Sequence, residues 1–438
     1  MDFCGWECKS RALRREPEEI QIAFIFLLDE TIFMSNEQFI ARQPIFDLSQ
    51  KVYAYELLFR SGLHNYFDCD DVDHASTSVI ANSFLLFGLD EVTGGRPAFL
   101  NCTRKVLIGN FAASLPRTHA VIEVLETVEP DEAVVAACRK LKEQGYTLAL
   151  DDFVYRKAYE PLLELADIVK VDFLISGPGE RQRLSSQLRR RGIRMLAEKV
   201  ETQEDFEQAV AMGYELFQGY FFSKPVILSR RDIPVNKLPY LRILKEIHSP
   251  ELDFNGMAQI IQQEISLSYK LLKLINSAAF GLRHKVANIL QALSLLGERE
   301  IRNWVSLLSI SAMANDKPSE LVVSSLIRAR FCDETAPLVG ERKQHSELFL
   351  MGLFSQLDAI LDRPMDELLD EIQVSANVRE ALVTQRGVFY QILELAIALE
   401  RGLWPQLRAL AEVLKLDEQV CSEIYLRALK WSQQTYTP

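Results

Sequence analysis

The 438-residue sequence contains no Cys-x-x-Cys pair, and its seven cysteines are scattered between residues 4 and 421. An odd number of unclustered cysteines indicates neither a disulfide framework nor a zinc site. We therefore expect reduced thiols and a cytoplasmic protein. No apolar run reaches the roughly 20 residues that a membrane-spanning helix requires, so we predict no membrane span.

The sequence also lacks an excess of positive charge. Its 49 Lys and Arg residues are outnumbered by 61 Asp and Glu residues, which gives a formal net charge of −12. The most basic stretch, GERQRLSSQLRRRGIR at 179–194, is predicted to be a solvated helix on the outside of the first domain. We therefore expect no binding to nucleic acid.

The N-terminus lacks a convincing targeting signal. The basic stretch SRALRR precedes the apolar run IQIAFIFLL, but three glutamates separate them and no small-residue cleavage site follows. We interpret residues 1–35 as a poorly specified N-terminal extension. Met34 is a candidate for the true start, because everything after it is patterned as a domain.

Between residues 36 and 228, short apolar runs alternate with amphipathic segments. Repetition of strand and helix favours an α/β fold with parallel strands. The length fits a (β/α)₈ barrel, and a doubly wound open sheet is the alternative. The predicted strands lie near 38–46 and at 52–59, 97–103, 119–126, 146–153, 167–174, 193–200 and 215–222.

After Pro225 the strand pattern stops. Met257, Ile260, Ile261 and Ile265 follow helical spacing and are predicted to share one face. We predict a linker at 226–237 and an all-α domain over residues 229–438.

Polar residues stand at the ends of the predicted strands. Each has an ordinary explanation as a turn former or a solvated strand end. At the carboxyl ends of parallel strands, however, they would converge on one mouth, where carboxylates repel each other unless cations neutralise them. An all-oxygen ligand set suits Mg²⁺ or Mn²⁺, and a nearby lysine fits phosphoester hydrolysis. From the residues alone, the structural and the metal interpretation both stay open. The residues are Glu56, Asn101, Glu123, Asp151, Asp152, Lys170, Glu198 and Gln218.

Seven motifs, in order, resemble EAL-type cyclic-di-GMP phosphodiesterase domains. The resemblance implies a (β/α)₈ barrel with one antiparallel strand near its start. It also implies a two-metal site for Mg²⁺ or Mn²⁺ that hydrolyses cyclic di-GMP to pGpG and so favours motility over biofilm. The motifs are ARQPIFDLSQKVYAYELLFR (41–60), FLN (99–101), EVLE (123–126), LDDF (150–153), KVD (170–172), AEKVET (197–202) and QGYFFSKP (218–225).

The same resemblance implies a role for each site residue. Glu56, Asn101, Glu123 and Asp151 match the ligands of the first metal, and Asp152 matches a ligand of the second metal and of the attacking water. Lys170 matches the lysine that positions this water or stabilises phosphate charge. Glu198 matches the general base or its orienter. Gln43, Arg60 and Gln218 are expected to bind substrate, and Glu126 to support the loop after Asp152.

That loop departs from the family pattern. The family usually has DDFGTGYSSL, whereas this sequence has DDFVYRKAYEPL, without glycine. Because residues other than glycine rarely adopt positive φ, the loop must have another conformation. The alternative function is therefore a catalytically weak or inactive barrel, which acts as a cyclic-di-GMP sensor or adaptor and signals through the helical domain. Among its partners, a second copy of the same chain is a candidate, which would make the protein a homodimer.

The second half resembles HDOD domains, an all-α relative of HD phosphohydrolases. The resemblance rests on KLLKLINSAAFGLRHKVANILQALSLLGEREIRNWVSL at 270–307. None of the six histidines is followed by Asp, as an HD metal site requires. We expect His248 and His284 to be surface or cap residues, and the domain to bind an unidentified protein partner.

Overall fold

The computed structural model describes residues 38–61, 89–109, 112–219, 236–249, 253–276, 286 and 288–436. The N-terminal extension, with Met34, lies outside the described residues. So do His284 and most of the linker predicted at 226–237. The expectations for these segments stay predictions.

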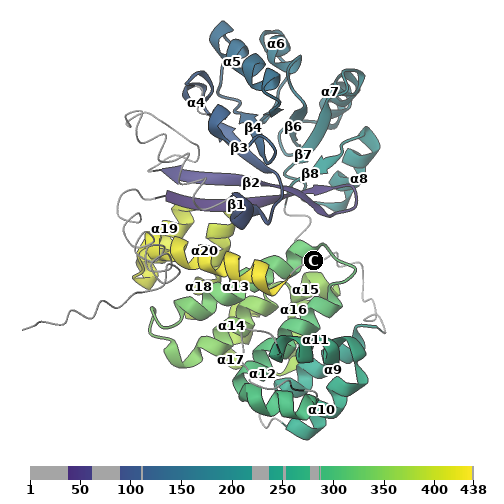
Figure 1. Ribbon diagram of the computed structural model, residues 1–438, viewed down its shortest axis with the longest axis vertical. Coiled ribbons are helices and arrows are strands. Elements are labelled where there is room, and N and C mark those ends of the chain that lie inside the picture. The colour runs from purple at the N-terminus through teal and green to yellow at the C-terminus, as the bar shows by residue number, and fades with distance from the viewer. Residues whose placement is uncertain are drawn as a thin grey trace, which may run out of the picture.

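Eight strands form a closed barrel in chain order (Figure 1). The first strand pairs antiparallel with both the second and the eighth, and the other pairs are parallel. The predicted barrel with one antiparallel strand is therefore confirmed, and the open-sheet alternative is wrong. The strands are β1 (Gln38–Asp47), β2 (Val52–Ser61), β3 (Ala98–Cys102), β4 (Ala120–Val124), β5 (Thr147–Leu150), β6 (Ile168–Asp172), β7 (Arg194–Glu198) and β8 (Leu216–Phe217).

The barrel is buried on both faces of its strands. Inward side chains such as Ile45, Phe99 and Leu196 fill its interior, and outward side chains pack under the helices. The described helices around it are α3 (Leu89–Thr93), α4 (Arg104–Ile108), α5 (Glu132–Glu143), α6 (Glu160–Leu163), α7 (Pro178–Arg190) and α8 (Gln203–Met212). The predicted basic helix is α7, which lies outside the barrel with most of its arginines exposed. Arg181 differs, because it is buried with its guanidinium 4.2 Å from the ring centroid of Phe173.

The second half is helical, as predicted. Met257 and Ile261 are buried in one helix, but that helix ends at Gln263, so Ile265 begins the next one. A longer helix is interrupted at Gly297, whose φ is 74°. The described helices are α9 (Leu238–Ile247), α10 (Phe254–Gln263), α11 (Ile265–Ile275), α12 (Ile289–Met313), α13 (Ser319–Thr335), α14 (His345–Phe354), α15 (Leu357–Leu361), α16 (Met365–Ile372), α17 (Ala376–Arg379), α18 (Gly387–Arg401), α19 (Trp404–Leu414) and α20 (Glu418–Thr435).

The helical region packs against the start of the barrel. β1 and β2 form a hairpin with no helix between them, and α18 and α20 lie beside β1 (Figure 1). Ala41 of β1 belongs to the same apolar core as Phe331 and Leu399 of the helical region. The C-terminal helices therefore cover a part of the barrel that its own helices leave open.

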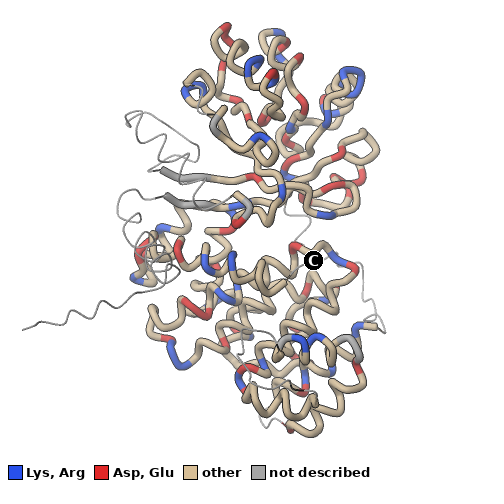
Figure 2. The backbone as a smooth tube through the Cα atoms, viewed as in Figure 1, with Lys and Arg blue, Asp and Glu red and all other residues tan. Residues whose placement is uncertain are grey.

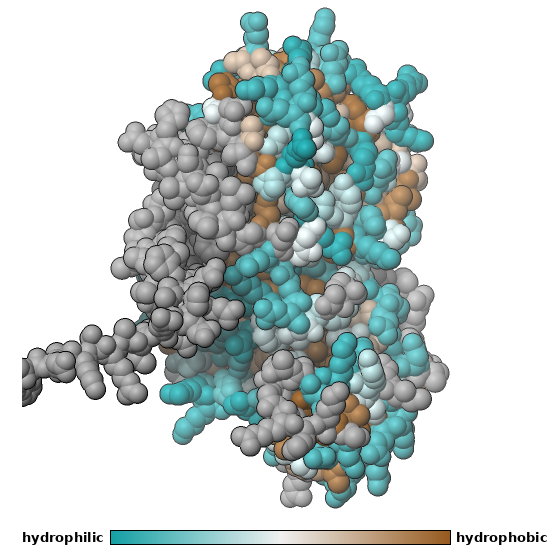
Figure 3. All heavy atoms as spheres, in the orientation of Figure 1, coloured by the Kyte–Doolittle hydropathy of each residue, from teal (hydrophilic) through white to brown (hydrophobic). Residues whose placement is uncertain are grey.

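Charge is distributed over both regions. Figure 2 shows acidic and basic residues interspersed along the barrel helices and the helical region. In Figure 3 the visible face is mostly hydrophilic, with scattered apolar residues. Among the described helices, none is by itself long and apolar enough to cross a membrane. The helical segments 376–384 and 387–401 together have the length and composition of a membrane span, but they are bent by 53° relative to each other.

Candidate active site

The predicted polar residues meet at one end of the barrel because strand pairing aligns them. Gln43 of β1 stands opposite Glu56 of β2, and Asn101 of β3 stands opposite Glu123 of β4. Asp151 directly follows β5, and Gln218 directly follows β8. The carboxyl ends of the parallel strands thus form a single polar mouth, as predicted, but Glu56 lies in the middle of β2 and not at its end.

Lys170 lies at the centre of this mouth. Its side chain is 1% exposed, and its Nζ contacts four carboxylates from four other strands or strand ends. It pairs with Glu123, which is fully buried. The other distances from Nζ are 2.9 Å to Asp151 Oδ1, 2.9 Å to Glu198 Oε1 and 3.3 Å to Glu56 Oε2.

Two amides orient the Glu56 carboxylate. Asn101 Nδ2 donates to Glu56 Oε1 at 3.1 Å, and Gln218 Nε2 donates to Glu56 Oε2 at 2.9 Å. Gln218 Nε2 also donates to Gln43 Oε1 at 2.9 Å. The residue after Gln218 is Gly219, whose φ is 153° and where a Cβ would overlap the backbone of Val200, so only glycine fits there.

For the ionisable groups of the mouth, burial and the neighbouring charges shift the pKa in opposite directions. Burial raises the pKa of Glu123 and of Glu198 well above the ordinary carboxyl value, although Lys170 opposes both shifts. For Asp151, burial is outweighed by Lys170, so its pKa is lowered. Burial disfavours the Lys170 ammonium, but the carboxylates around it raise its pKa well above the ordinary lysine value. Lys170 therefore supplies positive charge among these carboxylates.

The mouth offers oxygen ligands that the chain itself leaves unused. Five of its buried oxygens have no hydrogen-bond partner among the described residues: Asn101 Oδ1, Glu123 Oε2, Asp152 Oδ1, Glu198 Oε2 and Gln218 Oε1. Unpaired buried acceptors are unfavourable unless a donor or a cation reaches them. Oxygens of Asp151, Asp152 and Glu198 also lie within 4.8 Å of one another. The donor set therefore fits a hard divalent cation such as Mg²⁺ or Mn²⁺.

Two further charged residues lie at this site, and the sequence analysis did not predict either of them as a site residue. Asp172, the last residue of β6, is buried and accepts a 2.7 Å hydrogen bond from the Leu174 amide. Lys199 pairs with Asp172, and its Nζ lies 3.8 Å from Asp152 Oδ2. Asp172 could have been found from its place at the strand end, but Lys199 could not, because its φ of 54° turns it into the site.

The unusual loop after Asp152 has a defined conformation. Asp152 has a φ of 39°, and no residue from 153 to 159 has positive φ. Phe153 is buried, its amide donates to the Lys170 carbonyl at 3.0 Å, and its ring packs edge-on against Tyr159. Val154 and Tyr155 are 48% and 43% exposed. The loop therefore does without glycine: Arg156 is extended, with φ −133° and ψ 144°, and a 3-10 turn follows at Lys157–Tyr159.

The remaining predicted residues lie at the edge of the mouth or outside it. Glu126 is exposed, and its backbone carbonyl accepts a 3.2 Å hydrogen bond from Tyr159 Oη at the end of the loop. Arg60 lies near the end of β2, but its side chain is outside the described part of the structure. Leu57, the neighbour of Glu56, packs in the core between strands and helices.

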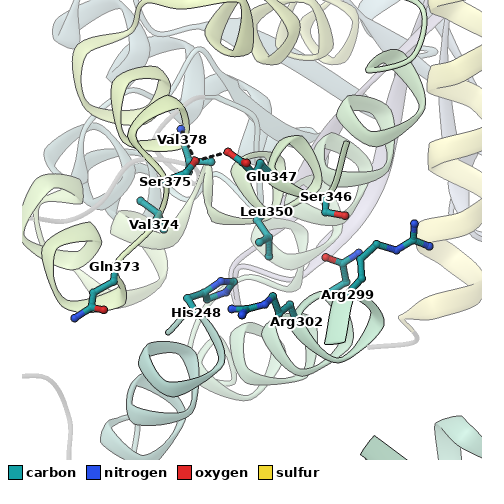
Figure 4. A pocket seen from close by; sticks show the side chains of 11 residues that line it. His248, Arg299, Arg302, Ser346, Glu347, Leu350, Gln373, Val374, Ser375 and Val378 are labelled. Carbon is teal, nitrogen blue, oxygen red and sulfur yellow. Dashed lines mark hydrogen bonds between the residues drawn. The ribbon is translucent and has the colours of Figure 1, made fainter. Parts of the chain in front are cut away.

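The helical region contains a separate cavity of about 200 Å³ (Figure 4). His248, the C-cap residue of α9, lines it, and its Nε2 lies 3.0 Å from Ser306 Oγ. Burial lowers the pKa of His248 to about 3, so the ring is neutral. Arg302, which also lines the cavity, donates to the Ile247 and Ser249 carbonyls. We expected a surface or cap residue at His248; it is the C-cap residue of α9, and it is not on the surface.

Comparison with known proteins identifies both halves. The protein-family model for the EAL domain matches residues 101–225, and the family model for the HDOD domain matches residues 233–385. Protein YuxH of Bacillus subtilis (strain 168) is 37% identical over 401 residues, which are 90% of this chain and 97% of that protein. Its name assigns it no function.

A second relative has a named activity. Cyclic di-GMP phosphodiesterase CdgJ of Vibrio cholerae is 35% identical over 401 residues, which are 90% of this chain and 92% of that protein. The solved structure of Klebsiella pneumoniae BlrP1 with calcium and cyclic di-GMP has a TM-score of 0.36 and 23% identity. It covers 47% of this chain and 65% of that one, and is too distant to support an argument. The two full-length relatives and the two domain matches are decisive: the chain belongs to the family of proteins in which an EAL domain is followed by an HDOD domain.

Proposed function

We propose that the barrel is a divalent-metal-dependent phosphodiesterase that hydrolyses cyclic di-GMP to linear pGpG. The observation that carries this proposal is the buried mouth in which Lys170 contacts four carboxylates beside five unpaired oxygens. The 35% identity with CdgJ supports the choice of substrate. Acting in the cytoplasm, the protein would lower cyclic di-GMP and favour motility over biofilm formation.

In this proposal Glu56, Asn101, Glu123 and Asp151 hold one Mg²⁺ or Mn²⁺ ion, and Asp152 helps to hold a second. Such cations, when bound, neutralise the phosphodiester and lower the pKa of a bound water. Within the described part of the chain, no group donates a hydrogen bond to one oxygen each of Asn101, Glu123 and Asp152, so these oxygens are available as metal ligands.

The other residues of the mouth act on the substrate and on protons. Lys170 stays protonated, so it donates hydrogen bonds and stabilises negative charge on the phosphate, and it does not act as a base. Glu198 has a raised pKa and an unpaired Oε2, which suits it to accept a proton from the attacking water. Gln43 and Gln218 lie at the same rim, where they would contact the nucleotide with Arg60.

The alternative is a barrel that binds cyclic di-GMP without turnover and signals through the helical region. The feature that favours it is the loop at 153–159, which lacks glycine and exposes Val154 and Tyr155 beside the Asp151–Asp152 pair. Binding by such a sensor would need the mouth but not the attacking water.

Purified full-length protein incubated with cyclic di-GMP and Mn²⁺ separates the two functions. We expect pGpG to accumulate, as measured by chromatography. Glu56→Ala should abolish it, because the variant removes an oxygen ligand held by two amides. Glu215→Ala is the matched control, because Glu215 is half exposed and pairs only at the surface with Arg194. Intact nucleotide binding without pGpG at micromolar protein would refute hydrolysis and favour the sensor.

A further inference from the structure

The helical region touches the catalytic mouth itself. The last residue of α18 is Arg401, and its backbone carbonyl accepts a hydrogen bond from Gln43 Nε2 at 3.2 Å. These two residues are 358 positions apart in the chain. Both α18 and α20 lie beyond residue 385, where the match to the HDOD domain ends.

This contact is the first link of a continuous hydrogen-bonded chain. Gln43 Oε1 accepts from Gln218 Nε2 at 2.9 Å, and the same nitrogen donates to Glu56 Oε2 at 2.9 Å. That oxygen in turn lies 3.3 Å from Lys170 Nζ. The chain therefore runs from the end of α18 to an expected metal ligand and to the central cation.

The Arg401 carbonyl also decides how the Gln43 amide is turned. A carbonyl only accepts hydrogen bonds, so the Gln43 amino group must face Arg401. The Gln43 carbonyl oxygen is then left to face Gln218, which presents its own amino group. If the end of α18 moved away, Gln43 would lose the partner that fixes this orientation.

Close packing holds the end of α18 in place. Gly402, the C-cap residue of α18, has a φ of 67°. A Cβ at this position would lie 2.9 Å from Leu58 Cδ1 and 3.7 Å from Ala41 Cβ on the β1–β2 hairpin. Glycine thus allows the helix end to approach the hairpin closely enough for the Arg401 contact.

A second attachment fixes the hairpin to α13. Tyr55 Oη donates to Glu320 Oε2 at 2.8 Å, and Arg42 Nη2 lies 3.7 Å from Glu320 Oε1. The Arg42 guanidinium also lies 4.1 Å from the ring centroid of Tyr55 and donates to the Val92 carbonyl. The hairpin is therefore held by the helical region at two places, of which one leads into the mouth.

We propose that the end of α18 is a positioning element of the active site: the Arg401 carbonyl fixes Gln43 and, through Gln218, the Glu56 carboxylate. The proposal rests on the proposed function in that it takes Glu56 as a metal ligand. A change in the helical region that shifts this helix end alters the metal site, which links the helical region to catalysis without any contact to the substrate.

The first variants of the test place a side chain at the helix end and leave every residue of the mouth unchanged. Gly402→Leu drives a side chain against Leu58, and Gly402→Ala is the milder version. Gly340→Leu is the matched control, because Gly340 has a φ of 89° but nothing within 4 Å of a Cβ. Both positions therefore carry similar backbone strain, and only one touches the hairpin.

Mn²⁺ affinity of the full-length protein is the readout, measured by calorimetric titration without nucleotide. Changes in groups that orient metal ligands typically weaken binding by 10–100-fold, so we expect a loss of about tenfold for Gly402→Leu. Gly340→Leu should bind as the wild type does. In a Gln43→Met background the effect of Gly402→Leu should disappear, because Gln43 is the link through which it acts.

Equal affinities of the Gly402 variants and the Gly340 control would overturn the proposal. So would a loss that persists in full in the Gln43→Met background. Because the titration contains no cyclic di-GMP, a protein that fails to make pGpG refutes the proposed hydrolysis but leaves this comparison decisive. Circular dichroism spectra confirm that each variant is folded.

Discussion

Replacing Lys170 with methionine tests whether the mouth is built on charge balance. Methionine has a similar length and no charge, so the change removes the ammonium while it keeps most of the packing. Lys170 is 1% exposed and contacts Glu56, Glu123, Asp151 and Glu198. Within the described residues, the variant leaves these carboxylates facing one another without the cation between them.

The expected loss of stability is large. Removing one partner of a buried ion pair destabilises a protein by about 3–5 kcal/mol. For a domain of 150–250 residues this lowers the melting temperature by about 6–20 °C. Lys170 also opposes the raised pKa of Glu123 and Glu198, so these carboxyls should hold their protons to still higher pH in the variant. A carboxyl whose pKa is raised on folding destabilises the folded protein as the pH rises, so the difference from the wild type should grow with increasing pH.

Thermal unfolding followed by circular dichroism measures this loss, with and without Mn²⁺. Mn²⁺ should restore part of the melting temperature, because a divalent cation replaces the missing positive charge. Lys142→Met is the control: Lys142 pairs with Asp167 at 2.6 Å, but both side chains are about one-third exposed. An exposed pair contributes only about 0–1 kcal/mol. A Lys170→Met protein that melts like this control would refute the reasoning.

Two further predictions concern His248 and Lys199. The pKa of His248 is lowered to about 3 in the folded protein, so the unfolded chain gains the proton first as the pH falls below its ordinary value of 6.5. The free energy of unfolding should therefore drop by about 2 kcal/mol between pH 7 and pH 5; denaturant titration should show a smaller drop for His248→Gln. Lys199→Gly removes an ammonium 3.8 Å from Asp152 while glycine keeps the φ of 54° without strain. Mn²⁺ binding should gain affinity at a second site in calorimetric titrations, and an unchanged isotherm would show that Lys199 does not compete with a cation there.

The barrel could be predicted from the sequence because its strands follow a local pattern. Most apolar runs carry a polar residue at or near their end, and parallel pairing brings such ends together whatever the connecting helices do. Glu56, Asn101 and Glu123 could therefore be assigned to one mouth before any distance was known. That Lys170 lies among four carboxylates could not be predicted, because the pattern gives the end of a strand and not the reach of a side chain.

Other features depend on backbone conformation that the sequence does not reveal. Met257 to Ile265 follow one helical period, yet Glu264 is extended, with φ −102° and ψ 95°, and divides α10 from α11. Neither glycine nor proline marks this break. The positive φ of Lys199 is equally hidden, because lysine rarely adopts it. The contact between Gln43 and Arg401 joins residues too far apart for any local pattern to pair them.

The buried carboxylates are poorly explained by a structural role alone. Replacing a buried ion cluster with well-packed apolar side chains is often neutral or stabilising, so a barrel built only for stability would fill this end with residues like Ile45 and Phe99. Instead it keeps Glu123 fully buried, with one oxygen that no described residue pairs with. Such a cluster is reasonable only where a ligand supplies the missing positive charge. The same end of the barrel is also where the helical region reaches Gln43, so we expect a shift of α18 to act on this cluster first.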